Sequence, residues 1–255
     1  MLKKLKRKIS SVKIYKIPWI GKNDINIEEY RYQTIDLTIP EKANAHLFLI
    51  DLLAFDHRPF FEILSSDEKN KLERLISPVE QETRTKSRIA LRLILAEYLN
   101  TSPSEIVFLY GENGKPILKI PLKKISFNIS HSANNLAILI DSHKSIGIDI
   151  ESELRPSKVG IQLAKRFFHE KEVSILQNAK SEEQSILFSW IWSLKEAVLK
   201  STGRGMFSID TAPNFSFLIQ QKIHFNLQFY KTKEYVGFTL RTEEFWLSTA
   251  AMDQD

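Results

Sequence analysis

Two long stretches of the chain repeat their apolar residues every three to four positions, which is the spacing of one face of a helix. The first follows Pro78 and carries Ile89, Leu93, Ala96 and Leu99 on that face. The second spans residues 181–201, and its apolar face consists of Leu187, Trp190, Ile191, Leu194, Ala197 and Val198. Both stretches are therefore predicted to be helices that bury one face against the rest of the protein.

A shorter helix is predicted from Ser66, because Ser66-Asp67-Glu68-Lys69 has the composition of a capped helix start. Its apolar stripe would be Leu72, Leu75 and Ile76. Strand-like segments occur at residues 13–17, 45–50, 125–129, 136–140, 146–151, 223–229, 235–240 and 245–250. The chain therefore mixes helices and strands, and the three strands between residues 125 and 151 should form an antiparallel meander.

The strand at residues 146–151 alternates strictly, with isoleucine on one face and Gly147, Asp149 and Glu151 on the other. Two carboxylates that project from the same face two residues apart repel each other unless a cation lies between them. A metal site and an ordinary solvated strand face are equal alternatives for this segment. Gly147 would in addition allow a bulky ligand to approach the backbone.

The outward face of the helix at residues 181–201 carries Trp192, Glu196 and Lys200 at intervals of four residues. Glu196 and Lys200 alone could be an ordinary ion pair between neighbouring helical turns on the surface. Trp192 does not fit a solvated face, because a large outward aromatic side chain usually meets a second layer, a ligand or a partner. This face should therefore be covered.

Basic residues are concentrated at three other places. Arg84, Arg88 and Arg92 recur every four residues along the first long helix, where a solvated surface is favoured over phosphate binding. Lys115 follows a Gly-Glu-Asn-Gly turn and precedes a proline that disfavours helical geometry, so this lysine should lie at the edge of a loop. The first eight residues are also basic and are expected to be a solvated tail.

Composition restricts the class of protein. The chain has 255 residues, of which 43% are hydrophobic, enough for one large core or two smaller ones. Its net charge of +5 favours acidic partners such as nucleic acid, a phosphorylated cofactor or an acidic protein. It has no cysteine, which excludes a disulfide framework and a thiolate metal site and is consistent with a cytoplasmic location. We expect no membrane partner, because the sequence contains no apolar stretch with the length of a signal peptide or a membrane span.

Five motifs together resemble those of the Sfp-type 4'-phosphopantetheinyl transferases, which activate carrier proteins of fatty-acid, polyketide and nonribosomal-peptide synthesis. In sequence order the motifs are Gly114-Lys115-Pro116, Phe127-Asn128-Ile129-Ser130-His131-Ser132, Gly147-Ile148-Asp149-Ile150-Glu151, Arg166-Phe167-Phe168 with Glu172, and Trp192 to Lys200 followed by Gly203 and Gly205. The resemblance runs from about Ser77 to Met206. Each motif alone is weak, but five in the right order and at compatible spacing make a chance match improbable.

The resemblance implies an α+β fold of two similar halves related by a pseudo-twofold axis, each a small antiparallel sheet packed with helices. The first half would comprise residues 1–142, and the second half, which carries the metal site, residues 143–255. The break would thus fall near His143. Coenzyme A would bind in the cleft between the halves, and the protein would be a cytoplasmic monomer.

The resemblance also assigns a metal site. Asp149, Glu151 and Glu196 would bind a magnesium ion that also grips the pyrophosphate of coenzyme A. This assignment agrees with the independent reading of the strand acids, since oxygen ligands and phosphates are what magnesium prefers. Lys200 would lie beside the departing phosphate and contact the cofactor there.

Further contacts to coenzyme A are implied by the other motifs. Lys115 and His131 would bind its 3'-phosphate, and Ser130, which precedes His131, would be a further cofactor contact. Arg88 would be an additional phosphate partner on the basic helix. The resemblance therefore raises Arg88 above the solvated-surface interpretation that its spacing favours.

The implied reaction is the attack of a carrier-protein serine hydroxyl on the β-phosphorus of coenzyme A, with release of 3',5'-ADP. Magnesium and Lys200 would offset the negative charge that develops on the pyrophosphate oxygens. A base must accept the serine proton, and the resemblance nominates Glu172, with Glu196 or a metal-bound water as alternatives. The residue pattern alone gives Glu172 no reason to be more than a surface acid.

Two other classes of function use part of the same pattern. A metal-dependent phosphohydrolase would use the same carboxylates on water but would more often need a second metal cluster, which the sequence does not show. A basic nucleic-acid-binding module would account for the net charge. It should, however, interleave aromatic and basic residues on a sheet, whereas the aromatic residues of the last three strands alternate as core residues. Coenzyme A and an acyl or peptidyl carrier protein are therefore the expected partners, rather than nucleic acid.

Overall fold

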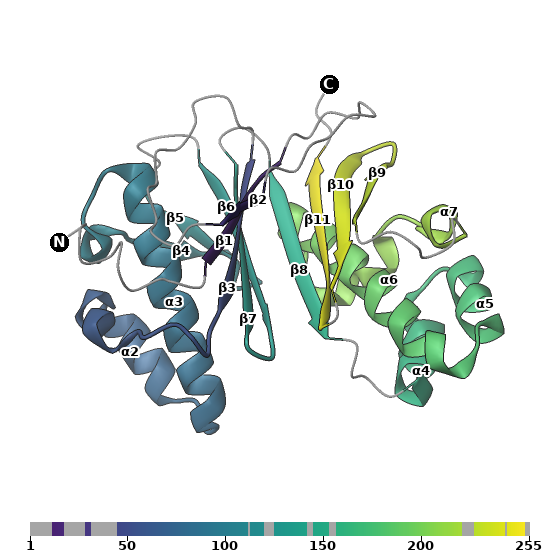
Figure 1. Ribbon diagram of the computed structural model, residues 1–255, viewed down its shortest axis with the longest axis horizontal. Helices are drawn as coiled ribbons and strands as arrows, with labels where there is room; N and C mark the ends of the chain where they lie inside the picture. The colour runs from purple at the N-terminus through teal and green to yellow at the C-terminus, as the bar shows by residue number, and fades with distance from the viewer. Residues whose placement is uncertain are drawn as a thin grey trace.

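The computed structural model describes residues 12–17, 29–31, 45–111, 113–119, 125–141, 145–152, 157–220, 227–242 and 244–252. Two antiparallel sheets face each other at the centre of the molecule, and helices cover the outer face of each sheet (Figure 1). This arrangement confirms the predicted α+β fold with two halves. None of the helices in the described part of the chain is long and apolar enough to cross a membrane.

The first half is built on a five-stranded sheet in the order β2-β1-β3-β7-β6. Its strands are β1 (Val12–Ile17), β2 (Glu29–Arg31), β3 (Ala45–Asp51), β6 (Ser126–Ser132) and β7 (Asn135–Asp141). Neighbouring strands pair in the antiparallel direction throughout. The predicted strands that begin near residues 13, 45, 125 and 136 are therefore confirmed to within a few residues at their ends.

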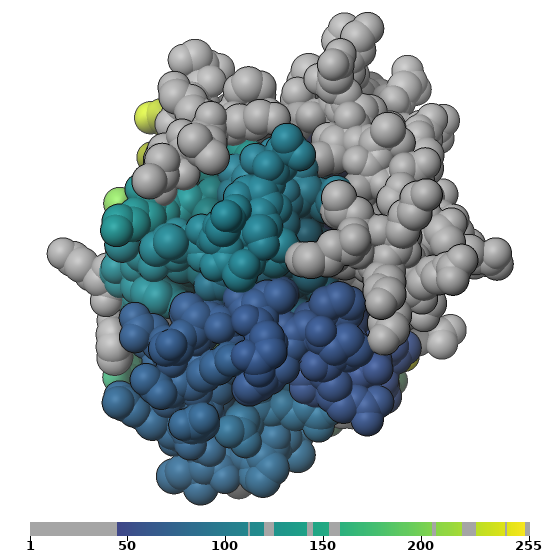
Figure 2. Space-filling view, turned by 90° about the vertical axis from the view of Figure 1, so that its left-hand side faces the viewer, coloured from purple at the N-terminus to yellow at the C-terminus, as the bar shows by residue number. Residues whose placement is uncertain are grey.

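Helices and a short hairpin cover the outer face of this sheet (Figure 1). They are the 3-10 helices η1 (Arg58–Ile63) and η2 (Pro103–Glu105), the helices α2 (Ser66–Glu73) and α3 (Pro78–Leu99), and the hairpin strands β4 (Phe108–Tyr110) and β5 (Pro116–Leu118). The Ser77 hydroxyl caps α3 by accepting the N–H of Glu80, and Asn100 ends the helix in the left-handed conformation. Ile89 and Leu93 are buried in the core beneath α3, as predicted. Figure 2 looks onto this side of the molecule, where residues of the two helices (blue) and of the later segments (teal) form one continuous surface.

The helix predicted from Ser66 is present, but its cap is Ser65, which forms a capping box with Glu68. Leu72 is buried and Leu75 packs against the same core, as predicted. The predicted role of Ile76 is wrong, because α2 ends at Glu73 and leaves Ile76 100% exposed. The cap of the next helix follows directly, so the chain leaves the helical path before Ile76 can face the core.

The second half contains a four-stranded sheet in the order β8-β11-β10-β9. Its elements are β8 (Ile146–Ser152), α4 (Ser157–Phe167), α5 (Glu170–Asn178), α6 (Ser181–Thr202), η3 (Met206–Thr211), α7 (Ser216–Ile219), β9 (Leu227–Lys231), β10 (Tyr235–Arg241) and β11 (Phe245–Met252). The long helix α6 matches its prediction, and all six residues of its predicted apolar face are buried. Trp246 and Phe238 in the last strands are buried too, which agrees with their predicted place in the core.

The predicted meander of three strands is wrong at its third strand. β6 and β7 pair as expected, but β8 pairs with β11 and so belongs to the second sheet. The isoleucines of β8 pack with Leu47 and Leu139 of the first sheet in the core between the two sheets. Proximity in sequence predicts pairing, but burial of this apolar face against the first sheet places β8 across from β7 rather than beside it. The predicted boundary at residue 142, near His143, falls on residues 142–144, which lie outside the described residues, and it stays a prediction.

Candidate functional site

The site is built where α6 lies directly against β8. A side-chain Cβ at Gly147 would lie 2.0 Å from the carbonyl oxygen of Ala197 and 2.4 Å from the backbone nitrogen of Ser201. Only glycine permits this contact between strand and helix. The prediction that Gly147 admits a ligand is therefore wrong: the backbone that approaches it is that of α6.

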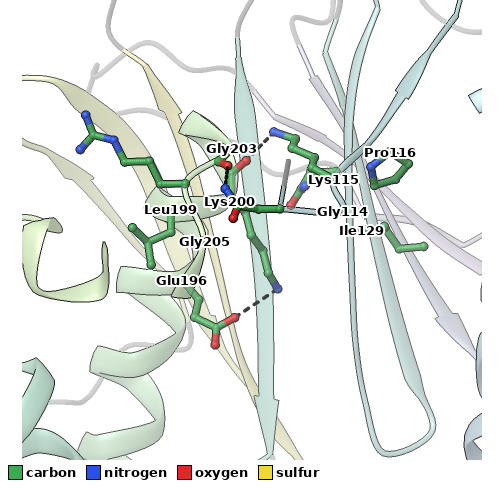
Figure 3. A pocket seen from close by; sticks show the side chains of 12 residues that line it. Gly114, Lys115, Pro116, Ile129, Glu196, Leu199, Lys200, Gly203 and Gly205 are labelled. Atoms are coloured by element: carbon green, nitrogen blue, oxygen red, sulfur yellow. Dashed lines mark hydrogen bonds and ion pairs between the residues drawn. The ribbon is translucent and has the colours of Figure 1, made fainter. Parts of the chain in front are cut away.

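Lys200 on α6 lies between two carboxylates. Its Nζ is 2.5 Å from Asp149 Oδ1 and 3.4 Å from Glu196 Oε2, and it donates to the Ser130 hydroxyl at 3.0 Å. The Ser130 hydroxyl in turn donates to Asp149 Oδ1 at 2.9 Å. Figure 3 shows the Lys200 side chain turned toward the Glu196 carboxylate. The structure therefore brings four of the predicted site residues together, from β6, β8 and α6.

These contacts change the proton affinities of the charged groups. Burial alone would lower the pKa of Lys200, but the charges of Asp149 and Glu196 outweigh burial and raise it. Burial and then the charge of Asp149 raise the pKa of Glu196, while Lys200 acts in the opposite direction. Lys200 is thus held as an ammonium group, and it offsets the repulsion between the two carboxylates.

The donor set of this cluster partly fits a magnesium ion. Asp149 Oδ2 is buried and has no hydrogen-bond partner among the described residues. A buried carboxylate oxygen without a partner is costly, and a hard cation would satisfy it. Glu151 follows on the same face of β8 and is partly exposed, but no three acidic or histidine side chains in the described segments lie close enough to hold a metal. Asp149 and Glu196 therefore fit the predicted metal site, whereas the structure does not draw Glu151 into a three-residue cluster with them.

A cavity of about 300 Å³ lies beside the cluster, between the β4–β5 hairpin and the C-terminal end of α6 (Figure 3). Its wall includes Lys115 and Pro116 from the hairpin, Asn128 and Ile129 from β6, and Glu196 and Lys200 from α6. Both halves of the molecule therefore form this cavity, which agrees with the predicted ligand cleft between them.

Lys115 lies in the hairpin turn, where Gly114 has a φ of +75° that favours glycine. Its backbone is at the loop edge, as predicted, but its side chain crosses to the second half. The ammonium donates to the carbonyl oxygen of Ile146 at 3.2 Å and also to that of Lys200 (Figure 3). No carboxylate among the described residues compensates for the loss of water, and burial lowers the pKa of Lys115 to about 8.

The predicted basic stripe of α3 is divided between two environments. Arg92 is buried and ion-paired with Glu68 at 2.7 Å, and Arg88 lies 3.4 Å from the other oxygen of the same carboxylate. The prediction of a solvated face is wrong for these two residues, because α2 brings Glu68 over them. Neither of them is among the described residues that line the cavity.

Arg84 is the arginine of this stripe whose charge reaches the predicted phosphate contacts. It is exposed and paired with Glu80 at 2.7 Å. His131 is exposed at the end of β6, yet partial desolvation of its ring, followed by the positive charges of Arg84 and Lys200, lowers its pKa. Positive charge therefore gathers around His131 from both halves, although Arg88 does not contribute to it.

Glu172 is fully buried, so the interpretation of a surface acid is wrong. Its carboxylate accepts the backbone N–H groups of His169 and Phe215 and lies 3.0 Å from the ammonium of Lys195, which is also 0% exposed. The sequence could not reveal this environment, because Phe215 lies 43 residues away along the chain. Glu172 is not among the described residues of the cavity wall, and the structure does not bring it to the Lys200 cluster.

Trp192 is buried in a cluster of aromatic side chains and is not exposed to a ligand. Its ring packs against Phe167, Phe168 and Phe188, and its indole N–H donates to Glu196 Oε1 at 2.8 Å. The prediction that this helix face is covered is confirmed, and the cover comes from the protein's own residues. Trp192 also fixes the Glu196 carboxylate.

Three polar or charged side chains in the cavity wall were not predicted as site residues: Asn113, Asn128 and Arg204. Asn113 donates to the carbonyl oxygen of Gly203 at 2.9 Å and so connects the hairpin to the end of α6. A Cβ at Gly205 would lie 2.7 Å from the Asn113 side chain, so this side chain would have to shift if another residue stood there. Asn113 precedes one of the motifs and Asn128 lies within another. Their closeness in sequence to predicted site residues was the only feature that could have identified them as cavity residues.

Two family models match this chain. The model described as the 4'-phosphopantetheinyl transferase superfamily matches residues 145–250, and the model described as 4'-phosphopantetheinyl transferase, N-terminal, matches residues 56–143. The two matches together include most of the elements that form the site.

Individual relatives carry the same description. The putative 4'-phosphopantetheinyl transferase slr0495 of Synechocystis is 37% identical over 145 residues, which cover 56% of this chain and 58% of the relative. HetI of Nostoc is 38% identical, over 58% of this chain and 62% of the relative, so the match spans less than two thirds of either protein. AcpT of Salmonella typhimurium is 32% identical over 54% of this chain and 69% of its own length. The chain therefore belongs to the 4'-phosphopantetheinyl transferase superfamily.

Proposed function

We propose that this protein transfers the 4'-phosphopantetheine group from coenzyme A to a serine of an apo acyl or peptidyl carrier protein and releases 3',5'-ADP. The observation that carries the proposal is the cluster of Asp149, Lys200 and Glu196 beside a cavity formed by both halves. The carboxylates, one of which has an oxygen without a hydrogen-bond partner among the described residues, can bind a divalent metal, and the ammonium held between them can bind a phosphate. The names of the relatives support the same reaction.

Asp149 and Glu196 would hold the magnesium ion, with the unpartnered Asp149 Oδ2 as one ligand. The motifs nominate Glu151, on the same face of β8, as a third ligand, but its side chain does not lie close enough to Asp149 and Glu196 in this structure to form a three-residue cluster. Bound magnesium would supply Lewis-acid stabilisation of the charge on the pyrophosphate. Lys200 supplies a second positive charge there, because its contacts to both carboxylates keep it protonated and fixed.

The 3'-phosphate of coenzyme A would be bound by Lys115 and His131. We assign the arginine contact to Arg84 in place of Arg88, because the charge of Arg84 reaches His131. Arg84 is paired with the exposed Glu80, whereas the partner of Arg88 is the buried Glu68. Phosphate is a strong acceptor for such cationic donors, and it could replace the backbone carbonyls that Lys115 contacts in this structure.

Glu196 is the candidate base for the serine proton. It lines the cavity, so its carboxylate lies where a bound substrate could be reached. Glu172 was the residue nominated by the motifs, but a base must reach the proton it accepts. The Glu172 carboxylate is enclosed and already accepts from two N–H groups and an ammonium.

The test is to incubate the protein with coenzyme A, magnesium and a panel of purified apo carrier proteins, and to measure the mass of each carrier. We expect one carrier serine to gain one phosphopantetheine group, and we expect a chelator to stop the reaction until magnesium is restored. Hydrolysis of coenzyme A without modification of any carrier would instead favour a phosphohydrolase. A shift of a nucleic-acid probe without carrier modification would favour the nucleic-acid-binding alternative.

We also propose that the protein acts as a monomer, since both halves of the site belong to one chain. The proposed reaction needs neither nucleic acid nor a membrane. A cytoplasmic location remains an expectation from the composition.

A further inference from the structure

A row of side chains on β6 connects the two halves. β8 lies at the edge of its sheet and pairs with β11 on one side. On the other side, its backbone N–H groups donate to side chains of β6 and not to the backbone of a neighbouring strand. The acceptors are Asn128 Oδ1 for Ile148 at 2.8 Å, Ser130 Oγ for Ile150 at 3.4 Å, and Ser132 Oγ for Ser152 at 3.2 Å. We call Asn128, Ser130 and Ser132 the side-chain ladder. It satisfies the free edge of β8 without joining the two sheets by backbone pairing.

Ser130 is the member of this ladder that also contacts the charged cluster. Its hydroxyl donates to Asp149 Oδ1 at 2.9 Å and accepts from Lys200 Nζ at 3.0 Å, in addition to the N–H of Ile150. A hydroxyl has one proton to donate and two lone pairs to accept with. All three are used, and Ser130 is buried. The side chain therefore has no hydrogen-bonding capacity left for a cofactor.

We infer that Ser130 is a positioning residue, which fixes Lys200 against Asp149, and that its side chain is not a contact to coenzyme A. Lysine carries its charge on a flexible four-carbon stem. A hydrogen bond to the fixed hydroxyl of Ser130 therefore restricts the ammonium of Lys200 to one orientation, in which it can face the phosphate. Ser130 provides that acceptor from the first half, while Lys200 and Asp149 belong to the second. This inference rests on the proposed function for its kinetic test, but not for its stability test.

Ser132 is the matched control. It is a serine on the same strand, and it accepts one β8 N–H as Ser130 does. The experiment compares Ser130→Ala, Ser130→Thr and Ser132→Ala for kcat, for KM of coenzyme A and for direct binding of coenzyme A by calorimetry. We expect Ser130→Ala to lower kcat by roughly ten- to a hundredfold while coenzyme A affinity stays within about twofold. Ser130→Thr should restore much of kcat because it restores the hydroxyl, and Ser132→Ala should change neither quantity by more than about twofold.

A stability measurement separates this inference from the proposed function. In a double-mutant cycle, the effects of Ser130→Ala and Lys200→Met on the melting temperature should be non-additive, because the two side chains are in contact. The effects of Ser132→Ala and Lys200→Met should add. An inactive wild-type protein with this coupling intact would overturn the proposed function and leave the positioning role standing.

Three results would overturn the inference. The first is a Ser130→Ala variant that binds coenzyme A at least tenfold more weakly with unchanged kcat, which would make Ser130 a direct ligand. The second is an equal loss of kcat in Ser130→Ala and Ser132→Ala, which would show that Ser130 only connects the two halves, as Ser132 does, and does not position Lys200. The third is additive behaviour of Ser130 and Lys200 in the stability cycle.

Discussion

The two halves of the molecule use the same scaffold, and each contains a buried ion pair at the same place. The long helices α3 and α6 both have 22 residues, and Arg92 and Lys195 occupy the same position counted from their starts. Each cation pairs with a glutamate in the capping box of the preceding short helix, at 2.7 Å for Glu68 and 3.0 Å for Glu172. Each cation also donates to a proline carbonyl oxygen further along the chain.

The halves differ at the positions that form the site. The last residue of β3 pairs with the first residue of β7, as Asp51 with Asn135. The last residue of β8 pairs in the same way with the first residue of β11, as Ser152 with Phe245, and these two pairs set the correspondence between the halves. Counted from that pair and from the helix starts, the second-half residues Gly147, Asp149, Glu151 and Glu196 correspond to His46, Phe48, Ile50 and Leu93. Of these four, Phe48, Ile50 and Leu93 are core residues of the first half.

This comparison distinguishes scaffold from site. A buried ion pair that occurs in both halves, including the half where apolar residues replace the acidic cluster, stabilises the fold rather than performing the chemistry. The acidic cluster occurs in the second half, and the corresponding residues of the first half are apolar core residues. The shared scaffold therefore does not require these acidic residues. The same comparison explains Gly147: its counterpart His46 donates to or accepts from Tyr98 of α3 at 2.7 Å, whereas Gly147 lets α6 lie against the strand.

The largest effect is expected when either buried ion pair is broken. Glu172→Gln and Glu68→Gln each leave a buried cation without its carboxylate, and we expect each to lower the free energy of unfolding by about 3–5 kcal/mol. Chemical denaturation of the two variants measures this loss. Removal of the cation as well, as in Glu172→Gln with Lys195→Met, keeps an acceptor for the N–H groups of His169 and Phe215 and should recover most of the stability and retain transfer. A Glu172→Gln variant that folds with wild-type stability and has lost transfer would contradict the comparison and make Glu172 catalytic.

The next largest effect concerns the acidic cluster of the second half. Asp149→Asn and Glu196→Gln should each lower kcat/KM by about a hundred- to a thousandfold, because each removes charge that organises Lys200 and the proposed metal. Their melting temperatures should stay close to that of the wild type. Carrier modification by mass and circular dichroism of the same samples separate the two quantities. Full activity in either purified variant would remove the assignment of the metal site.

A smaller effect is expected from the strand–helix contact. Gly147→Ala would force a Cβ into the backbone of α6, and we expect a loss of about 1–3 kcal/mol of stability together with a lower kcat. Gly111→Ala is the control, because its added Cβ would meet only one atom, at 3.8 Å. Urea titration and steady-state kinetics of both variants give the comparison. Equal stability of the two variants would show that α6 can move away from β8 without cost.

The smallest effect is a pH dependence of ligand binding. Lys115 has a pKa of about 8, so it is mostly protonated at pH 7 and mostly neutral at pH 9. If its ammonium binds the 3'-phosphate, affinity for 3',5'-ADP should fall by about tenfold between these pH values, beyond the change in a Lys115→Gln variant. Calorimetry at the two pH values measures the difference. A wild-type protein and a Lys115→Gln variant with the same pH profile would exclude this contact.

Local patterns in the sequence predicted the elements well where one signal dominated. The apolar periods of α3 and α6 and the alternation of β8 each follow from burial of one face, which is encoded in the spacing of residues within that element. Predictions failed where a residue's environment depends on a distant segment. Arg92 and Glu172 were interpreted as surface residues, but each is buried in an ion pair with a residue of another helix, Arg92 with Glu68 and Glu172 with Lys195. The spacing of residues within one helix does not reveal a partner in another.

The sequence by itself determined the helices α2, α3 and α6, most of the strands, the alternating face of Asp149 and Glu151, and the covered face of Trp192. Its motifs also indicated the family. Only the tertiary structure decided that β8 joins the second sheet, that Lys115 reaches across to α6, and that Ser130 connects Lys200 to Asp149. The physical reason is the range of the interactions: periodicity records burial within a single element, whereas ion pairs and hydrogen bonds between halves depend on how those elements pack.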